Sequence, residues 1–319
     1  MGLPVTVYRS TDVGAPQLDG TILSLLVVIQ KVLVDGYGQK LGLGWTRLFF
    51  DDTAGAVIYR NNISEGGSGG VVRFNATNGI STLNTSINIQ VAKDASSLNA
   101  LFHKSPSIYR YVQSSALVWE IIGTGRGFYM SISPSTIPRL GYSTVLQWTQ
   151  FLGDITPYWP NDAGTFVMVT GSPLSSDSTT TSDSFSIGGT NSLYAMLYNT
   201  DGVNNMVAYK CDTPSWIYST SNAAHNNATP IEDNMLVTLT PMVLGVSSPF
   251  NVDTNNLPII QSKVSPMCRG EITGLFISPM GCYQTFSEHF KDVVFDGVNY
   301  TRIRGNNANN LWVQTDAWY

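Results

Sequence analysis

Residues 19–38 read Asp-Gly-Thr-Ile-Leu-Ser-Leu-Leu-Val-Val-Ile-Gln-Lys-Val-Leu-Val-Asp-Gly-Tyr-Gly, and the fold depends on this stretch. A side-chain oxygen of Asp19 or Thr21 can accept a free backbone N–H at a helix start, and Gly36 can adopt the left-handed conformation that ends a helix. We therefore predict one helix over Thr21–Val34. At about 100° per residue its apolar side chains cover nearly the whole circumference, so it needs covering by its own domain or by another subunit.

The composition of the chain predicts an oligomer. Its 319 residues are 43% hydrophobic and only 12% charged, about half the usual charged fraction of ~25%. A monomer with so few surface charges would tend to associate, so we expect a homo-oligomer or a part of a larger assembly. The residues expected at a subunit interface are those of the helix and of the aromatic C-terminus: Leu25, Leu26, Ile29, Leu33, Trp318 and Tyr319.

The C-terminal segment Leu311–Tyr319 ends on two large aromatic residues. Because such side chains normally bury roughly 150–250 Å² each, we expect this end to be held in place. Leu311–Thr315 is predicted to complete a sheet, and the two aromatic residues are predicted to pack on the body of the protein or on a neighbour.

The remainder of the chain predicts a mainly β protein, an antiparallel sandwich or barrel. Short apolar runs recur at close intervals, with turn signals such as Asn78-Gly79 between them, which is typical of that class. Only Ser96–His103 suggests another short helix. The expected strands are Val5–Ser10, Trp45–Phe50, Ala56–Arg60, Val71–Ala76, Ile87–Ala92, Ile108–Gln113, Leu117–Ile122, Phe128–Ser133, Val145–Leu152, Leu193–Tyr198, Met206–Cys211, Met235–Val246, Ile272–Ile277, Val293–Phe295, Tyr300–Arg304 and Leu311–Thr315.

The clearest change of composition marks a domain boundary. Ser172–Ser186 is rich in Ser and Thr and lacks a buried face, so we predict an exposed loop or linker there. The expected units are an N-terminal strand, loop and helix in 1–43 and a β-rich domain in 44–171. Residues 187–319 would form a second β-rich domain or continue the first.

Charge and hydropathy argue against several classes of partner. The net charge is −5 and no basic run is present, which disfavours nucleic-acid binding through phosphates. The longest apolar run is too short to span a bilayer, and the first residues do not resemble a secretory signal. Cys211, Cys268 and Cys282 lie far apart, so we expect buried free thiols in a protein made in a reducing cytoplasm.

Motifs that could carry chemistry have simpler interpretations. Gly123–Gly127 resembles a phosphate-binding turn, but a strand pattern follows it where a helix would be needed; we predict a hairpin turn. His103, His225 and His289 do not have the spacing of metal ligands. We therefore expect no enzymatic activity, no cofactor and no metal.

A hydrolase remains one alternative. Glycoside hydrolysis needs two carboxyl groups about 5–9.5 Å apart. Each candidate lies beside Gly, Asn or Pro, where an acidic side chain more often caps a turn. The candidates are Asp154, Asp162, Glu271 and Asp296.

A ligand-binding patch is the other alternative. Tyr158-Trp159-Pro160 lies in an expected loop. Sugar-binding modules use exposed aromatic side chains, although most Trp residues of β proteins lie in cores or interfaces. We therefore name Tyr158 and Trp159 as the candidate ligand patch.

Several segments, in order along the chain, resemble a family of virion structural proteins of tailed bacteriophages. The sequence departs from the family pattern at Leu41-Gly-Leu43, where we associate an Ala-rich stretch with the family, and residues 52–115 have no counterpart in it. The segments that carry the resemblance are Val7–Thr21 running into the helix, Val34–Lys40 with Gly44-Trp-Thr, Phe151–Ile155, Pro160–Ala163, Asn234–Val243, Arg269–Phe276 and the C-terminal Asp316–Tyr319.

The resemblance implies a structural subunit of a phage particle and does not indicate its position on the particle. We expect the tail, baseplate or neck, and synthesis in the cytoplasm of the bacterial host. The resemblance implies no catalytic residues. Its partners would be further copies of the chain and other virion structural proteins, with no nucleic acid and no membrane. The alternatives are a host-glycan-binding module at the particle periphery and a capsid-decorating protein.

Overall fold

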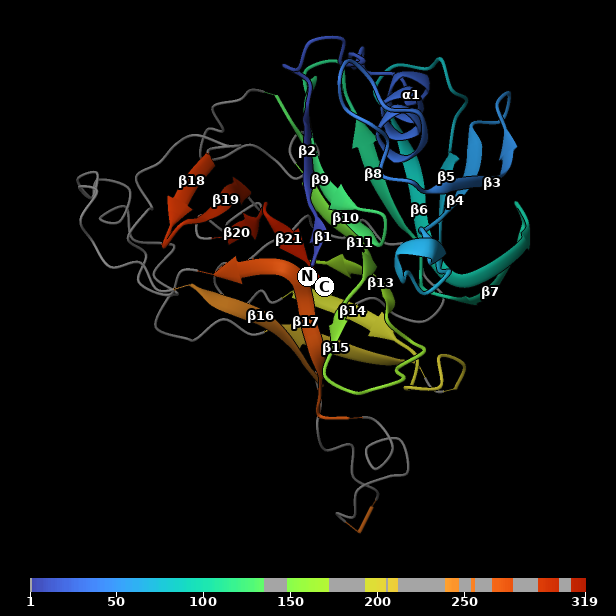
Figure 1. The fold of residues 1–319 in the computed structure, drawn as a ribbon. Coiled ribbons are helices and arrows are strands. Elements are labelled where there is room, and N and C mark those ends of the chain that lie inside the picture. The colour runs from blue at the N-terminus through green and yellow to red at the C-terminus, as the bar shows by residue number, and fades with distance from the viewer. Residues whose placement is uncertain are drawn as a thin grey trace.

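The computed structural model describes residues 2–134, 148–171, 193–204, 206–211, 239–246, 254–255, 266–277, 292–303 and 311–319. The chain is mainly β, with antiparallel sheets and one helical segment near the N-terminus, as the sequence predicts (Figure 1). The helical elements are α1 (Ile22–Gln30), the π-helical turn η1 (Lys31–Asp35) and the 3-10 turn η2 (Ile63–Glu65).

The strands match most of the expected runs. Their bounds are β1 Leu3–Pro4, β2 Thr6–Arg9, β3 Thr46–Asp51, β4 Ala56–Arg60, β5 Val71–Ala76, β6 Thr85–Ser97, β7 Ala100–Lys104, β8 Ile108–Val112, β9 Val118–Thr124, β10 Gly127–Ser133, β11 Trp148–Asp154, β12 Thr156–Pro157, β13 Phe166–Thr170, β14 Leu193–Leu197, β15 Val207–Cys211, β16 Thr240–Val246, β17 Cys268–Ile277, β18 Asp292–Phe295, β19 Val298–Ile303, β20 Leu311–Gln314 and β21 Ala317–Trp318.

Thr21 and Gly36 determine where the helical segment begins and ends. The Thr21 hydroxyl accepts a hydrogen bond from the backbone N–H of Ser24 (3.2 Å), and Asp19 in turn accepts from Thr21. Gly36 adopts a φ of 80°, and a Cβ there would collide with the backbone oxygen of Lys40. A side chain at this position would therefore strain the end of the helix.

Three antiparallel sheets are formed by the described residues. The largest has the order β18-β19-β20-β17-β16-β15-β14-β13-β11-β10-β9-β2, with β12 paired to β17. A six-stranded sheet has the order β3-β4-β5-β6-β7, with β8 on β6, and β1 pairs with β21. The Gly123–Gly127 segment is the tight hairpin between β9 and β10, because Thr124 pairs with Gly127. The predicted hairpin turn is confirmed.

Strands β9, β10 and β11 lie between two hydrophobic cores. Along β10, Phe128 and Met130 face a first core that contains the helix and the six-stranded sheet. Tyr129, between them, faces a second core inside the large sheet. Both faces of these strands are therefore covered by protein, and every residue of β10 and β11 is buried.

The large sheet curls so that its two end strands meet. Arg9 on β2 donates two hydrogen bonds to Asp292 on β18, at 2.8 and 2.5 Å, and one to Glu120 on β9 at 2.6 Å. Side chains rather than backbone bonds thus join the two ends of the sheet. Figure 1 shows the N- and C-termini side by side near the middle of the molecule, where β1 pairs with β21.

Some expectations need correction. Ser96–His103 is the hairpin of β6 and β7 rather than a helix, and β13 was not expected. Cys211 is buried as expected, but Cys268 is exposed; Cys282 lies outside the described residues. The apolar circumference of the helix is not fully covered, since Leu23 is 46% exposed and Val27 is 43% exposed.

The predicted linker Ser172–Ser186 lies outside the described residues. Strands from both sides of it, β13 and β14, pair in the large sheet. The division into domains stays a prediction.

Candidate functional site

An exposed apolar surface lies along one face of α1. Leu23 and Val27, one helical turn apart, are half exposed, and Leu83, on the segment next to the helix start, is 54% exposed. The segment that carries Leu83 is held against the helix start, because Leu23 N–H donates to Ile80 and Thr21 forms an isolated bridge with Leu83. We call Leu23, Val27 and Leu83 the helix patch. It could bury apolar area against another protein.

Most of the predicted interface residues lie elsewhere. Leu25, Ile29 and Leu33 are buried in the first core and Trp318 is buried in the second. They are covered by their own chain, so they cannot offer their side chains to a second subunit. Leu26 and Tyr319 are partly buried against the same cores.

The candidate ligand patch is exposed. Tyr158 is 48% exposed and Trp159 is 49% exposed. The Tyr158 hydroxyl donates to Glu271 and the Trp159 indole N–H donates to the carbonyl of Cys268, both at 2.9 Å. The two rings are therefore held in fixed positions while part of each faces solvent. We call Tyr158 and Trp159 the aromatic pair.

A buried ion pair supports the loop that carries the aromatic pair. The Arg269 guanidinium bonds both carboxylate oxygens of Asp162, and neither side chain is exposed. It also donates to the carbonyl of Tyr198 at 2.7 Å, while the carbonyl of Arg269 accepts the N–H of Tyr158. Arg269 thus joins β17 to two neighbouring loops. Breaking such a pair leaves an uncompensated buried charge.

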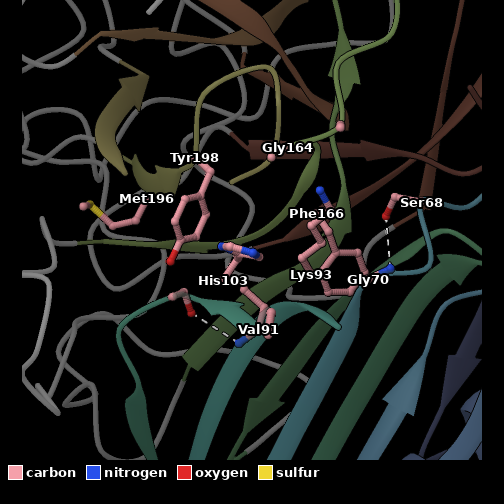
Figure 2. A pocket seen from close by; sticks show the side chains of 13 residues that line it. Ser68, Gly70, Val91, Lys93, His103, Gly164, Phe166, Met196 and Tyr198 are labelled. Carbon is pink, nitrogen blue, oxygen red and sulfur yellow. Dashed lines mark hydrogen bonds between the residues drawn. The ribbon is translucent and has the colours of Figure 1, made fainter. Parts of the chain in front are cut away.

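A small cavity lies where the six-stranded sheet meets the strands and loops around β13 and β14 (Figure 2). Its volume is about 30 Å³, enough for about two or three waters. We call it the strand pocket. The side chains that give it chemical character are Ser68, Lys93, His103, Ser105, Phe166 and Tyr198.

Lys93 and His103 face each other across β6 and β7. The register of these strands places the two residues opposite one another, because Ala92 pairs with Lys104 and Asp94 pairs with Phe102. His103 has a φ of 50°, which is uncommon for a residue with a side chain. Figure 2 shows its ring beside that of Tyr198, in an edge-to-face contact with centroids 5.4 Å apart.

The pocket hydroxyls are already engaged. Ser68 accepts the N–H of Gly70, and Ser105 accepts the N–H of Val91 while donating to the carbonyl of Pro106. Tyr198 donates to the carbonyl of Lys104 at 3.1 Å. Ser105 and Tyr198 thus use their hydroxyl protons within the chain, and the side-chain donors that remain for a ligand among these lining residues are on Ser68, Lys93 and His103.

The four carboxylates named for a hydrolase have structural partners or turn positions. Asp154 is fully buried and accepts hydrogen bonds from Asn61, the backbone N–H of Ser68 and Thr165; burial raises its pKa despite these bonds. Asp162 pairs with Arg269, Glu271 accepts from Tyr158, and Asp296 lies in the turn between β18 and β19 with a positive φ.

Neither a metal-binding cluster nor a membrane-spanning helix is formed by the described residues. Within the described ranges, no group of three His, Cys, Asp or Glu residues has the arrangement to hold a metal ion. His225 and His289 lie outside those ranges. No helix in the described part of the chain has the length and apolar character to cross a membrane.

No protein-family model matches the sequence, and no curated protein matches it significantly. Its interpretation rests on the residues described above.

Proposed function

We propose that the protein is a structural subunit that works by non-covalent assembly with copies of itself and with other proteins. The helix patch is the observation that carries this proposal. Apolar side chains on one helix face remain half exposed after the chain has covered the rest of that helix. Together with the low charge of the chain, such a surface favours association.

The particle in which it assembles is proposed from the sequence. The segments between Val7 and Tyr319 resemble virion structural proteins of tailed bacteriophages, and a mainly β fold suits a subunit of a tail, baseplate or neck. A capsid-decorating protein would need the same kind of surface. The protein would be made in the bacterial cytoplasm and then incorporated into the particle.

Self-association can be tested on the purified protein. Wild-type chain should form oligomers in sedimentation velocity as concentration rises, whereas Leu23→Asp should shift the population toward monomer because the charge would be desolvated at the contact. Ser81→Asp, which adds the same charge at an exposed polar position nearby, is the control. A wild-type chain that stays monomeric and enters no particle would contradict the proposal.

Incorporation into a virion can be tested separately. Antibody labelling of purified phage particles, viewed by electron microscopy, should place the subunit at a defined position on the tail, baseplate, neck or capsid surface. Particles that contain no copy of the chain by mass spectrometry would exclude a virion role.

A second candidate function is binding of a host glycan at the aromatic pair. Two half-exposed rings fixed by hydrogen bonds are suited to stacking on sugar rings. Trp159→Ala should abolish binding to host surface polysaccharide in a pull-down. Trp318→Ala changes a buried Trp outside the aromatic pair, so the folded fraction of that variant should bind the polysaccharide as wild type does. Unchanged binding by Trp159→Ala would reject this candidate.

A further inference from the structure

The strand pocket has two nitrogen donors and no acid bound to them. The Lys93 ammonium donates to the backbone carbonyl of Asp201 at 3.3 Å, and it forms no salt bridge with the described residues. The Asp201 carboxylate instead accepts the backbone N–H groups of Val203 and Asn204. The His103 ring nitrogens form no hydrogen bond with the part of the chain that the structure describes.

The surrounding structure holds these donors in position. Lys93 and His103 lie on adjacent strands, and the positive φ of His103 sets the direction of its ring toward Tyr198. Uncommon backbone conformations persist only where the surroundings enforce them, and they gather at ligand sites. Tyr198, which lines the pocket from the loop after β14, is itself held by the hydrogen bond from Arg269 to its backbone carbonyl.

The size of the pocket limits what it can hold. A cavity of about 30 Å³ can hold a group of a few heavy atoms and is too small to enclose a whole nucleotide. The rings of Phe166 and Tyr198 add apolar surface beside it. A carboxylate is the right size, and an ammonium and an imidazole are suitable donors for its oxygens.

We propose that the strand pocket binds a single oxyanionic group between Lys93 and His103, such as the carboxylate of an acidic sugar. The rest of the sugar would contact the aromatic side chains that line the pocket. Inorganic phosphate also presents negatively charged oxygen acceptors, but without a sugar ring. This binding does not depend on the assembly role, since it uses neither the helix patch nor the aromatic pair.

The proposal can be tested with the full chain by isothermal titration calorimetry, with glucuronate, glucose and inorganic phosphate as probes. Glucuronate should bind saturably and glucose should not, because glucose has the ring without the carboxylate. Phosphate binding as strong as that of glucuronate would assign the site to free anions. Stronger binding of glucuronate would assign it to acidic sugars. Binding of neither anion up to about 10 mM, where a millimolar Kd would be evident, would overturn the proposal.

Single substitutions can distinguish anion binding at Lys93 and His103 from a general effect of positive charge on the Kd. Lys93→Gln and His103→Asn should each weaken glucuronate or phosphate binding by about tenfold or more, as expected for the loss of a charge-assisted hydrogen bond. Asn tolerates the positive φ of position 103. Lys104→Gln removes the same charge from the next residue along β7, whose side chain does not line the pocket, and should change the Kd less than about twofold. Equal loss in all three variants would overturn the proposal, and Leu23→Asp should bind like wild type.

Discussion

Glu120 is a buried carboxyl group whose protonation state bears on the stability of this fold. It lies on β9 opposite Arg9 of β2, with a side chain that is only 1% exposed. One carboxylate oxygen accepts from Arg9, and the other has no hydrogen-bond partner among the described residues. Burial raises the pKa of Glu120 to about 8, although Arg9 acts in the opposite direction. Asp292 differs, because hydrogen bonds from Arg9 and Thr301 outweigh its burial and lower its pKa.

The raised pKa of Glu120 predicts that alkaline pH destabilises the protein. The folded state retains a proton that the unfolded chain releases near its ordinary pKa of 4.5, so the free energy of unfolding falls as pH rises from about 4.5 to about 8. The loss should be on the order of a few kcal/mol. Urea unfolding at a series of pH values checks this.

Glu120→Gln supplies the comparison for that pH series. The amide cannot ionise, so the decline in stability between about pH 6 and about pH 8 should become shallower than in wild type. Glu65→Gln, at an exposed position, should keep the wild-type slope. If Glu120→Gln also keeps that slope, Glu120 does not change protonation in this range.

At the scale of the element, the helix divides into two functional faces. Ile22, Leu25, Val28 and Ile29 lie in the first core, whereas Leu23 and Val27 are on the half-exposed helix patch. The same apolar sequence therefore has two separate roles. One face holds the helix to its own chain, and the other is available for the proposed assembly.

Two substitutions on the helix should consequently behave differently. Ile29→Asp would place an unpaired charge in the core and should lower the free energy of unfolding by about 3–5 kcal/mol. Leu23→Asp should change it by less than about 1 kcal/mol, because the side chain reaches solvent. Chemical denaturation of both variants measures the difference. Equal destabilisation would show that the patch is part of the core.

At the scale of the whole molecule, the C-terminus completes the second core. Trp318 is 3% exposed and contacts Tyr129 edge to face, with ring centroids 5.5 Å apart. The Tyr319 hydroxyl donates to the carbonyl of Asp154 at 2.6 Å, and its ring lies against Arg126. The expectation that the aromatic end is held in place is confirmed, and the partner is the body of the same chain.

Removal of this end should destabilise the whole protein. Trp318→Ala should lower the free energy of unfolding by about 3–5 kcal/mol, as for other buried aromatic residues, and deletion of Ala317–Tyr319 should lower it at least as much. Trp159→Ala removes the same residue type from a half-exposed site and should lower it far less. A wild-type melting temperature after the deletion would contradict the role assigned to the C-terminus.

Arg9 also links the two ends of the large sheet. Arg9 joins the end strands β2 and β18, so Arg9→Met should loosen both strands and leave the buried Glu120 carboxyl without its hydrogen-bond donor. Hydrogen exchange should become faster in β2, β18 and β19 than in wild type and stay unchanged in β4 and β5. Arg47→Met, which removes an ion pair with Asp52 on the six-stranded sheet, is the control. Unchanged exchange in β2 would show that backbone pairing alone holds the edge.

The sequence by itself determined the local elements of this protein. The cap at Thr21, the positive φ of Gly36 and the alternating apolar runs depend on residues close together in the chain, so the helix and most strands could be predicted. Ser96–His103 was the exception among these local predictions. Its residues suit a short helix as well as a strand, and antiparallel pairing between the end of β6 and β7 decided the outcome.

Only the tertiary structure decided which faces are covered and which residues meet. The apolar residues of the helix look alike in sequence, yet packing buries Ile29 and leaves Leu23 half exposed. Arg9 meets Asp292 across 283 positions, and the strand pocket unites residues from four distant segments. Such contacts depend on how the sheet curls, which no local pattern specifies, because burial is a property of the whole packed chain.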